Sequence, residues 1–126
     1  MPRLVAAHLI AALLFLMVGI GMGIYMAISH DFTLSPVHAH VNLLGWVTNA
    51  LIATIVWHAK DGTGRLGWTI FATFNLGVLL KNFGLGALLL GLKVPLFLLA
   101  GVLLISVGVL LFAASVFREA AGRHTA

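Results

Sequence analysis

Four long runs of apolar residues, separated by short polar segments, divide the chain. The runs cover residues 4–28, 36–58, 66–90 and 94–117. Each is longer than the roughly 20 helical residues that cross a hydrocarbon layer of about 30 Å. Pro36 and Pro95 stand where helix starts tolerate proline, and the Asp61-Gly62-Thr63-Gly64 stretch is typical of a turn. The pattern predicts an all-α, polytopic membrane protein with four transmembrane helices in a single domain, residues 1–126.

Composition supports this prediction. Of the 126 residues, 62% are hydrophobic and 8% are charged, against about 45–50% and about 25% in soluble domains. The first run, at about 25 residues, exceeds the roughly 7–15 of a signal-peptide core, so we expect a retained helix. The chain has no cysteine, which excludes disulfides and thiolate ligation of a metal.

Basic residues flank the runs and predict the orientation of the chain. One side would carry Arg3, Lys60, Arg65, Arg118 and Arg123, and the other Lys93 alone. The positive-inside rule then places both termini in the cytoplasm, and we expect a bacterial-type inner (cytoplasmic) membrane. The net charge of +4 does not indicate nucleic acid, because these residues are gathered at segment ends.

The second run carries the most informative polar residues. His38 and His40 are two residues apart, so at 100° per residue they point about 200° apart on a regular helix. The pair is therefore suited to two different neighbours rather than to one metal ion. Asn42, Trp46 and Asn49 follow on the His38 side. A packing role for these side chains is the alternative.

Three further residues are candidates for chemistry. Lys81 would lie roughly 22 Å from the cytoplasmic end of its helix, where it either snorkels outward or neutralises a ligand carboxylate, since no acidic residue occurs within the runs. His8 and His58 lie near the cytoplasmic boundary, as interfacial residues or as a second, inner metal site. Gly19 and Gly23 form a GxxxG pair that permits close approach of a helix or a flat ligand.

Histidine pairs without cysteine favour haem over other metal groups. Neutral imidazole ligates iron, copper and zinc, but zinc requires three or four protein ligands. Haem needs one or two axial ligands and fills an apolar cleft between helices. We therefore predict haem b bound by His38 and His40, with Lys81, Asn42 and Trp46 beside it, and copper as a possible further cofactor.

The segment "HAHVNLLGWV", residues 38–47, resembles the haem-ligating helix of subunit I of the haem–copper oxidases. It is also similar to the "HAHE…G" helix of the NnrS-like haem proteins linked to nitric oxide. Small four-helix proteins with this signature are described as cytochrome-c-oxidase subunit I-like. The resemblance covers about ten residues, and the number of helices extends it over the chain.

The resemblance implies a shared architecture. Oxidase subunit I has twelve helices in three arcs of four, and an HxH pair in one arc ligates two different haems. Four helices equal one arc, so a homotrimer would rebuild the ring. His40 would match the ligand of the low-spin haem and His38 that of the neighbouring haem. Each haem would then lie between adjacent protomers.

The chain departs from the oxidases in its catalytic equipment. It offers no separate histidine group for copper unless His30 or His58 is recruited, and its single tyrosine, Tyr25, lies in the first run. We expect a haem protein that transfers electrons, with an unknown redox partner, or binds nitric oxide or oxygen, and not a complete enzyme. The alternatives are a minimal nitric oxide or oxygen reductase with a second metal, a haem-free copper-binding protein, and a structural helix bundle.

Overall fold

The computed structural model describes residues 1–59 and 64–124, the last two of these by their backbone alone. Within these residues every regular element is helical. The elements are α1 (Arg3–Ser29), α2 (Ser35–His40), η1 (Val41–Thr48), α3 (Asn49–His58), α4 (Arg65–Leu89) and α5 (Pro95–His124). Since α2, η1 and α3 are continuous, they form one span. The chain therefore has four spans in its described part, each long and apolar enough to cross a membrane. The all-α, four-span prediction is confirmed.

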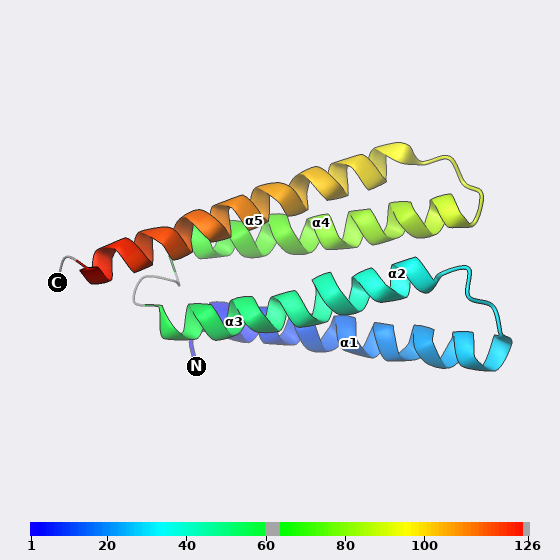
Figure 1. Cartoon of the computed structure of the whole chain (residues 1–126), viewed down its shortest axis with the longest axis horizontal. Helices are drawn as coiled ribbons and strands as arrows, with labels where there is room; N and C mark the ends of the chain where they lie inside the picture. The colour runs from blue at the N-terminus through cyan, green and yellow to red at the C-terminus, as the bar shows by residue number, and fades with distance from the viewer. Residues whose placement is uncertain (60–63, 125–126) are drawn as a thin grey trace.

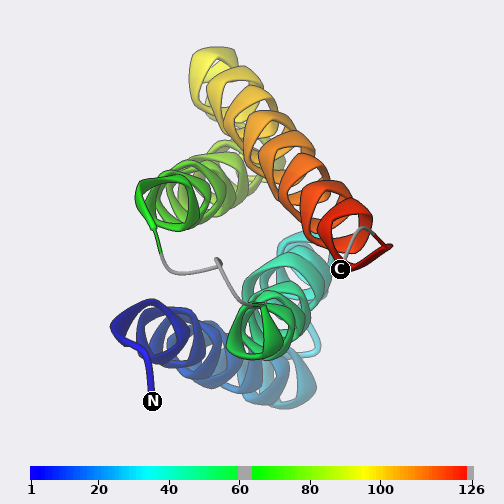
Figure 2. The ribbon, with the colours of Figure 1, turned by 90° about the vertical axis from the view of Figure 1, so that its left-hand side faces the viewer.

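The spans form two antiparallel hairpins that lie side by side (Figure 1). The first joins α1 to α2–η1–α3, and the second joins α4 to α5. Both termini lie at one end of the bundle, called here the terminal end, while the α1–α2 loop lies at the far end. Viewed along the bundle, α5 lies on the side of α4 away from α1 (Figure 2), and its backbone approaches α4 alone among the described elements.

Helix boundaries follow the apolar runs closely, except at the end of the last one. The fourth span was expected to end at residue 117, but α5 continues to His124. The added residues include Arg118, Glu119 and Ala120, which have high helix propensity. The end of the apolar run therefore marks where the helix leaves the hydrocarbon and not where it stops.

Glycines let α4 and α5 pack backbone to backbone. A Cβ on Gly101 of α5 would fall on the backbone of Lys81, and a Cβ on Gly77 would lie 2.6 Å from the amide nitrogen of Ile105. In lipid no hydrophobic force drives helices together. Small residues at such contacts let the two backbones approach closely, and the resulting van der Waals packing holds the helices together. The hairpin turns at Gly91, whose φ of +84° is the left-handed conformation that glycine adopts without strain.

The buried core lies in the half of the bundle nearer the terminal end. It contains Leu4, Val5, Ile52, Ala53, Val56, Phe74 and Val78. Large apolar side chains elsewhere point outward, including Met17 on α1 and Leu110 on α5, both 69% exposed. Such exposure would be costly in water but suits contact with lipid, so the chain is a membrane protein.

The second span is not the regular α-helix assumed from the sequence. Val41–Thr48 forms a π-helix, and the hydroxyl of Thr48 donates to the carbonyl of Leu43, five residues earlier, at 2.8 Å. Residues in such wider turns advance by less than 100° each. A helical-wheel count therefore does not give the directions of Asn49 and His58 relative to the histidine pair. Their contacts in the structure give them instead.

Candidate functional site

His38 faces α1. A Cβ on Gly23 would lie 3.3 Å from Cε1 of His38, and a side chain at Gly19 would collide with Asn42, one turn further along. Asn42 Nδ2 donates to the His38 carbonyl at 2.9 Å and lies 3.4 Å from the ring Nδ1. The GxxxG pair of α1 thus packs against two polar side chains of the second span. Of the two roles predicted for this pair, close approach of a helix or of a flat ligand, the structure shows the first.

His40 presents a different arrangement. Its Nδ1 lies 2.6 Å from the carbonyl oxygen of Pro36, and because a carbonyl can only accept, this nitrogen carries the hydrogen. The lone pair is then on Nε2. Metal-ligating histidines typically donate their other N–H to a carbonyl or carboxylate in this way. Since Val37 packs against Gly86 of α4 and His38 against α1, His40 lies on the remaining flank of α2, half-buried.

The residues proposed to surround the pair occupy two elements. Trp46 is half-buried within η1, and Lys81 is buried in α4 at 7% exposure. The Lys81 amine does not snorkel out of the chain, because Nζ is inaccessible and has no hydrogen-bond partner among the described residues. Its neighbour Asn82 has an unpartnered Oδ1 as well. An unpaired buried cation is costly, so this region is suited to an anionic group.

A second polar group, which the sequence did not reveal, crosses the core nearer the terminal end. His8 of α1 and Asn49 of α3 are each 0% exposed, and His8 Nδ1 lies 2.7 Å from Asn49 Oδ1. Asn49 Nδ2 donates to Asn75 Oδ1 of α4 at 2.9 Å. We call His8, Asn49 and Asn75 the polar clamp, because they tie both hairpins together.

Asn75 could have been identified from sequence only as one more amide inside an apolar run. Its partner Asn49 is 26 positions away and His8 is 41 positions from Asn49. No spacing within one helix reports such a contact. The ring of His8 is also held edge-on against Phe71, with centroids 4.9 Å apart.

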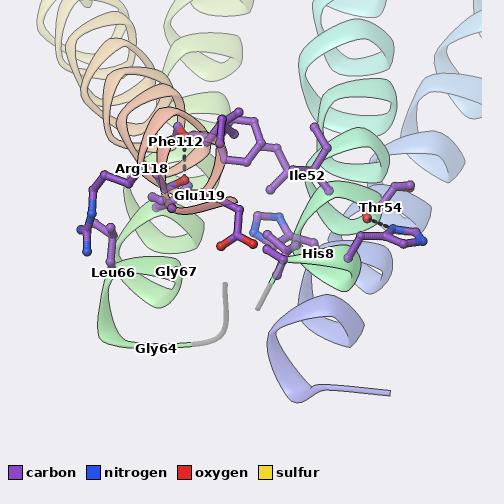
Figure 3. Close-up of a pocket in the computed structure, with 18 of the residues that line it drawn as sticks. His8, Ile52, Thr54, Gly64, Leu66, Gly67, Phe112, Arg118 and Glu119 are labelled. Carbon is purple, nitrogen blue, oxygen red and sulfur yellow. Dashed lines mark hydrogen bonds between the residues drawn. The ribbon is translucent and has the colours of Figure 1, made fainter. Parts of the chain in front are cut away.

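His8 and His58 both line a cavity of about 960 Å³ at the terminal end, between α3 on one side and α4 and α5 on the other (Figure 3). Its apolar wall includes Ile52, Ile70 and Phe112. His58 is exposed, and its Nδ1 lies 2.8 Å from the carbonyl oxygen of Thr54. The structure therefore brings the two histidines of the predicted inner site to one cavity.

Within residues 1–59 and 64–124, no three histidine or acidic side chains gather closely enough to hold a metal ion. A copper or zinc site built by a single chain would need such a group. Haem has no such requirement, because one imidazole is sufficient to anchor it. The chain matches no protein-family model, and comparisons with curated proteins and with solved structures yield no match either.

Proposed function

We propose that the chain is a haem b protein of the membrane, related to subunit I of the haem–copper oxidases, with His40 as an axial ligand. One observation carries the proposal: the Nδ1–H of His40 is donated to the Pro36 carbonyl at 2.6 Å, which fixes the tautomer with Nε2 available for iron. Haem b supplies a one-electron iron couple. We infer electron transfer as its use, with binding of nitric oxide or oxygen if the sixth position is open.

A buried amine in α4 supports haem over a smaller metal. Lys81, which packs against Gly101 of α5, has no hydrogen-bond partner for Nζ among the described residues, and a propionate would supply the missing negative charge. Asn42 bonds the backbone of His38 and would hold that histidine in place. The reductase and copper alternatives both need a multidentate protein site, and in the described residues its ligands would have to come from more than one chain.

The position of His40 also favours an oligomer. This half-buried side chain lies on an open flank of α2, so the chain covers a flat ligand there from one side. A neighbouring copy would cover the other side, and its His38, which packs against α1 of its own chain, would turn toward the interface to reach the ligand. We therefore propose a homotrimer with closed cyclic symmetry, in which each haem lies between His40 of one protomer and His38 of the next.

Substitution of His40 tests the proposed function. Purified wild-type protein is expected to show sharp reduced α and β bands and a positive pyridine haemochrome test. His40→Ala should abolish the bands of this haem, because iron loses an axial ligand. His30→Ala is the matched control, since His30 is an exposed histidine in the α1–α2 loop. Retention of the full spectrum by His40→Ala would refute the assignment.

Mixed oligomers test the ligation between protomers. Chains carrying His38→Ala and chains carrying His40→Ala should each lack this haem when expressed alone. Co-expression should restore part of it, because a ring that contains both variants has interfaces where an intact His40 meets an intact His38. No restoration in purified mixed oligomers would indicate ligation within one chain.

Single-cysteine labelling tests the orientation. The natural chain has no cysteine, so Thr33→Cys in the α1–α2 loop and Gly64→Cys before α4 each introduce one reactive thiol. The positive-inside rule places Gly64 on the cytoplasmic side and Thr33 outside. An impermeant maleimide added to intact cells should label Thr33→Cys alone. Labelling of Gly64→Cys alone would reverse the proposed topology.

A further inference from the structure

The polar clamp uses only one of the two ring nitrogens of His8. Asn49 Nδ2 donates to the Gly45 carbonyl at 2.8 Å and to Asn75 Oδ1 at 2.9 Å, so both amide hydrogens are used and Oδ1 must be the atom that faces His8. An amide oxygen only accepts. His8 Nδ1 therefore carries the hydrogen, and the lone pair of the ring is on Nε2.

This lone pair has no partner. Nε2 of His8 is buried and makes no hydrogen bond to the described part of the chain, although unpaired buried polar atoms are rare in folded proteins. The same pattern, with one ring nitrogen donating to a fixed oxygen and the other empty, holds His40 in α2. Three histidines, His8, His40 and His58, thus donate Nδ1 to an oxygen, which is the tautomer that a metal-ligating imidazole needs. Among the described residues, His8 is the one whose Nε2 is buried without a partner.

The cavity beside His8 has the remaining features of a tetrapyrrole site. Its volume of about 960 Å³ is at the upper end of the range of about 300–1,000 Å³ for small-molecule pockets. Apolar side chains of three helices line it, and Arg65 and Arg118 line it at the terminal end. In Figure 3, the side chain of Arg118 extends outward from α5, whereas the carboxylate of Glu119 points into the cavity, toward His8.

We propose that this cavity binds a second haem, with His8 Nε2 as its axial ligand and Arg65 and Arg118 pairing with its two propionates. An apolar lipid chain would satisfy the walls but not the lone pair. A neutral quinol would satisfy the lone pair but would gain nothing from the positive charge of Arg65 and Arg118, which are exposed beside the cavity. A flat, iron-bearing macrocycle with two propionates would use the walls, the lone pair and this charge. Glu119 also lines the cavity but already takes part in another interaction.

Binding requires a local rearrangement. His8 is 0% exposed, so the bound group must displace part of the wall to reach Nε2. The wall between the hairpins can yield here, because the backbone of α5 approaches neither α1 nor α3. The clamp itself can stay in place, since its hydrogen bonds use the opposite nitrogen of the ring.

A second haem would give the protein redox centres in both halves of the membrane. Asn49, which holds His8, follows His40 by nine residues, so the π-helix Val41–Thr48 separates the two histidines along the bundle. Electrons could then cross between the two sides of the bilayer through one chain. This consequence rests on the proposed haem at His40, whereas the site at His8 does not.

Haem stoichiometry tests the second site. Wild-type protein, quantified by pyridine haemochrome against amino-acid analysis, should contain two haems per chain. His8→Ala and His40→Ala should each retain one, with different residual spectra. The matched control is Ser115→Ala, which changes another residue that lines the cavity and should retain both. Haem content that is unaffected by His8→Ala refutes the second site, and content that is unaffected by His40→Ala refutes only the first.

Two further measurements separate ligation from folding. Imidazole added to His8→Ala should restore the missing band, as it replaces a lost ligand but not a lost packing contact. Arg118→Gln changes an exposed residue and should weaken haemin binding at this site several-fold without loss of the fold, even if His8→Ala does not fold. Unchanged haemin affinity, or native mass spectrometry showing phospholipid in the cavity instead of haem, would overturn the proposal.

Discussion

Gly101→Val is expected to separate α5 from α4. A Cβ at this position would fall on the backbone of Lys81, and backbone atoms of a packed helix cannot rotate away as a side-chain end can. Overpacking of a well-fitted interior typically costs about 1–3 kcal/mol, and a clash between two backbones belongs at the upper end. Since the backbone of α5 approaches that of α4 alone among the described elements, we expect this loss to release the whole helix.

The measurement is unfolding of the detergent-solubilised protein, followed by helical circular dichroism. Gly21→Val is the matched control, because it places the same β-branched residue in α1 where a Cβ would meet nothing within 4 Å. Both variants carry the same change in helix propensity. Equal destabilisation of the two would show that propensity and not packing is responsible, which would contradict the backbone seam.

Asn49→Leu is expected to destabilise the bundle by about 2 kcal/mol, because it leaves the buried Nδ1–H of His8 and the buried Oδ1 of Asn75 without partners. His8 Nδ1 would lose its acceptor at 2.7 Å, and Asn75 would lose both contacts with α3. Single hydrogen bonds between membrane helices average about 0.6 kcal/mol. The larger value is expected because one substitution affects two partner residues.

Asn82→Leu is the control for this prediction. Asn82 is buried in the same helix as Asn75, but among the described residues its Nδ2 bonds only the Val78 carbonyl of its own helix and its Oδ1 has no partner. Removal of an unsatisfied polar group is close to neutral or stabilising. Chemical unfolding should therefore rank Asn82→Leu above Asn49→Leu in stability. The reverse order would mean that the polar clamp does not stabilise the fold.

The different directions of His38 and His40 were predictable from residue spacing. Two histidines two positions apart on an α-helix must point in different directions, and the structure places both in α2, which is α-helical up to His40. The burial of Lys81 was less predictable, because a lysine near a membrane boundary can reach either way. Its direction was decided by Gly101, whose close approach in α5 leaves the lysine in the seam between the two helices.

The polar clamp could not be predicted. Asn49 was visible as one amide on the His38 side of a helix, and His8 as one of two boundary histidines. Their pairing depends on how the two hairpins pack and on the π-helix between His40 and Asn49, which changes the direction of every later residue in the span. Neither feature has a local sequence signal, since both arise from contacts between helices.

The sequence by itself determined the number of spans, their approximate limits and the kinds of side chain available for chemistry. These properties depend on hydrophobicity and helical periodicity, which act over one or a few turns. Only the tertiary structure decided that His8 meets Asn49 and Asn75, that α5 packs on α4 alone within the described chain, and that a cavity opens between the hairpins. In lipid, apolar surfaces do not select their partners, so small residues and buried hydrogen bonds set the arrangement of helices.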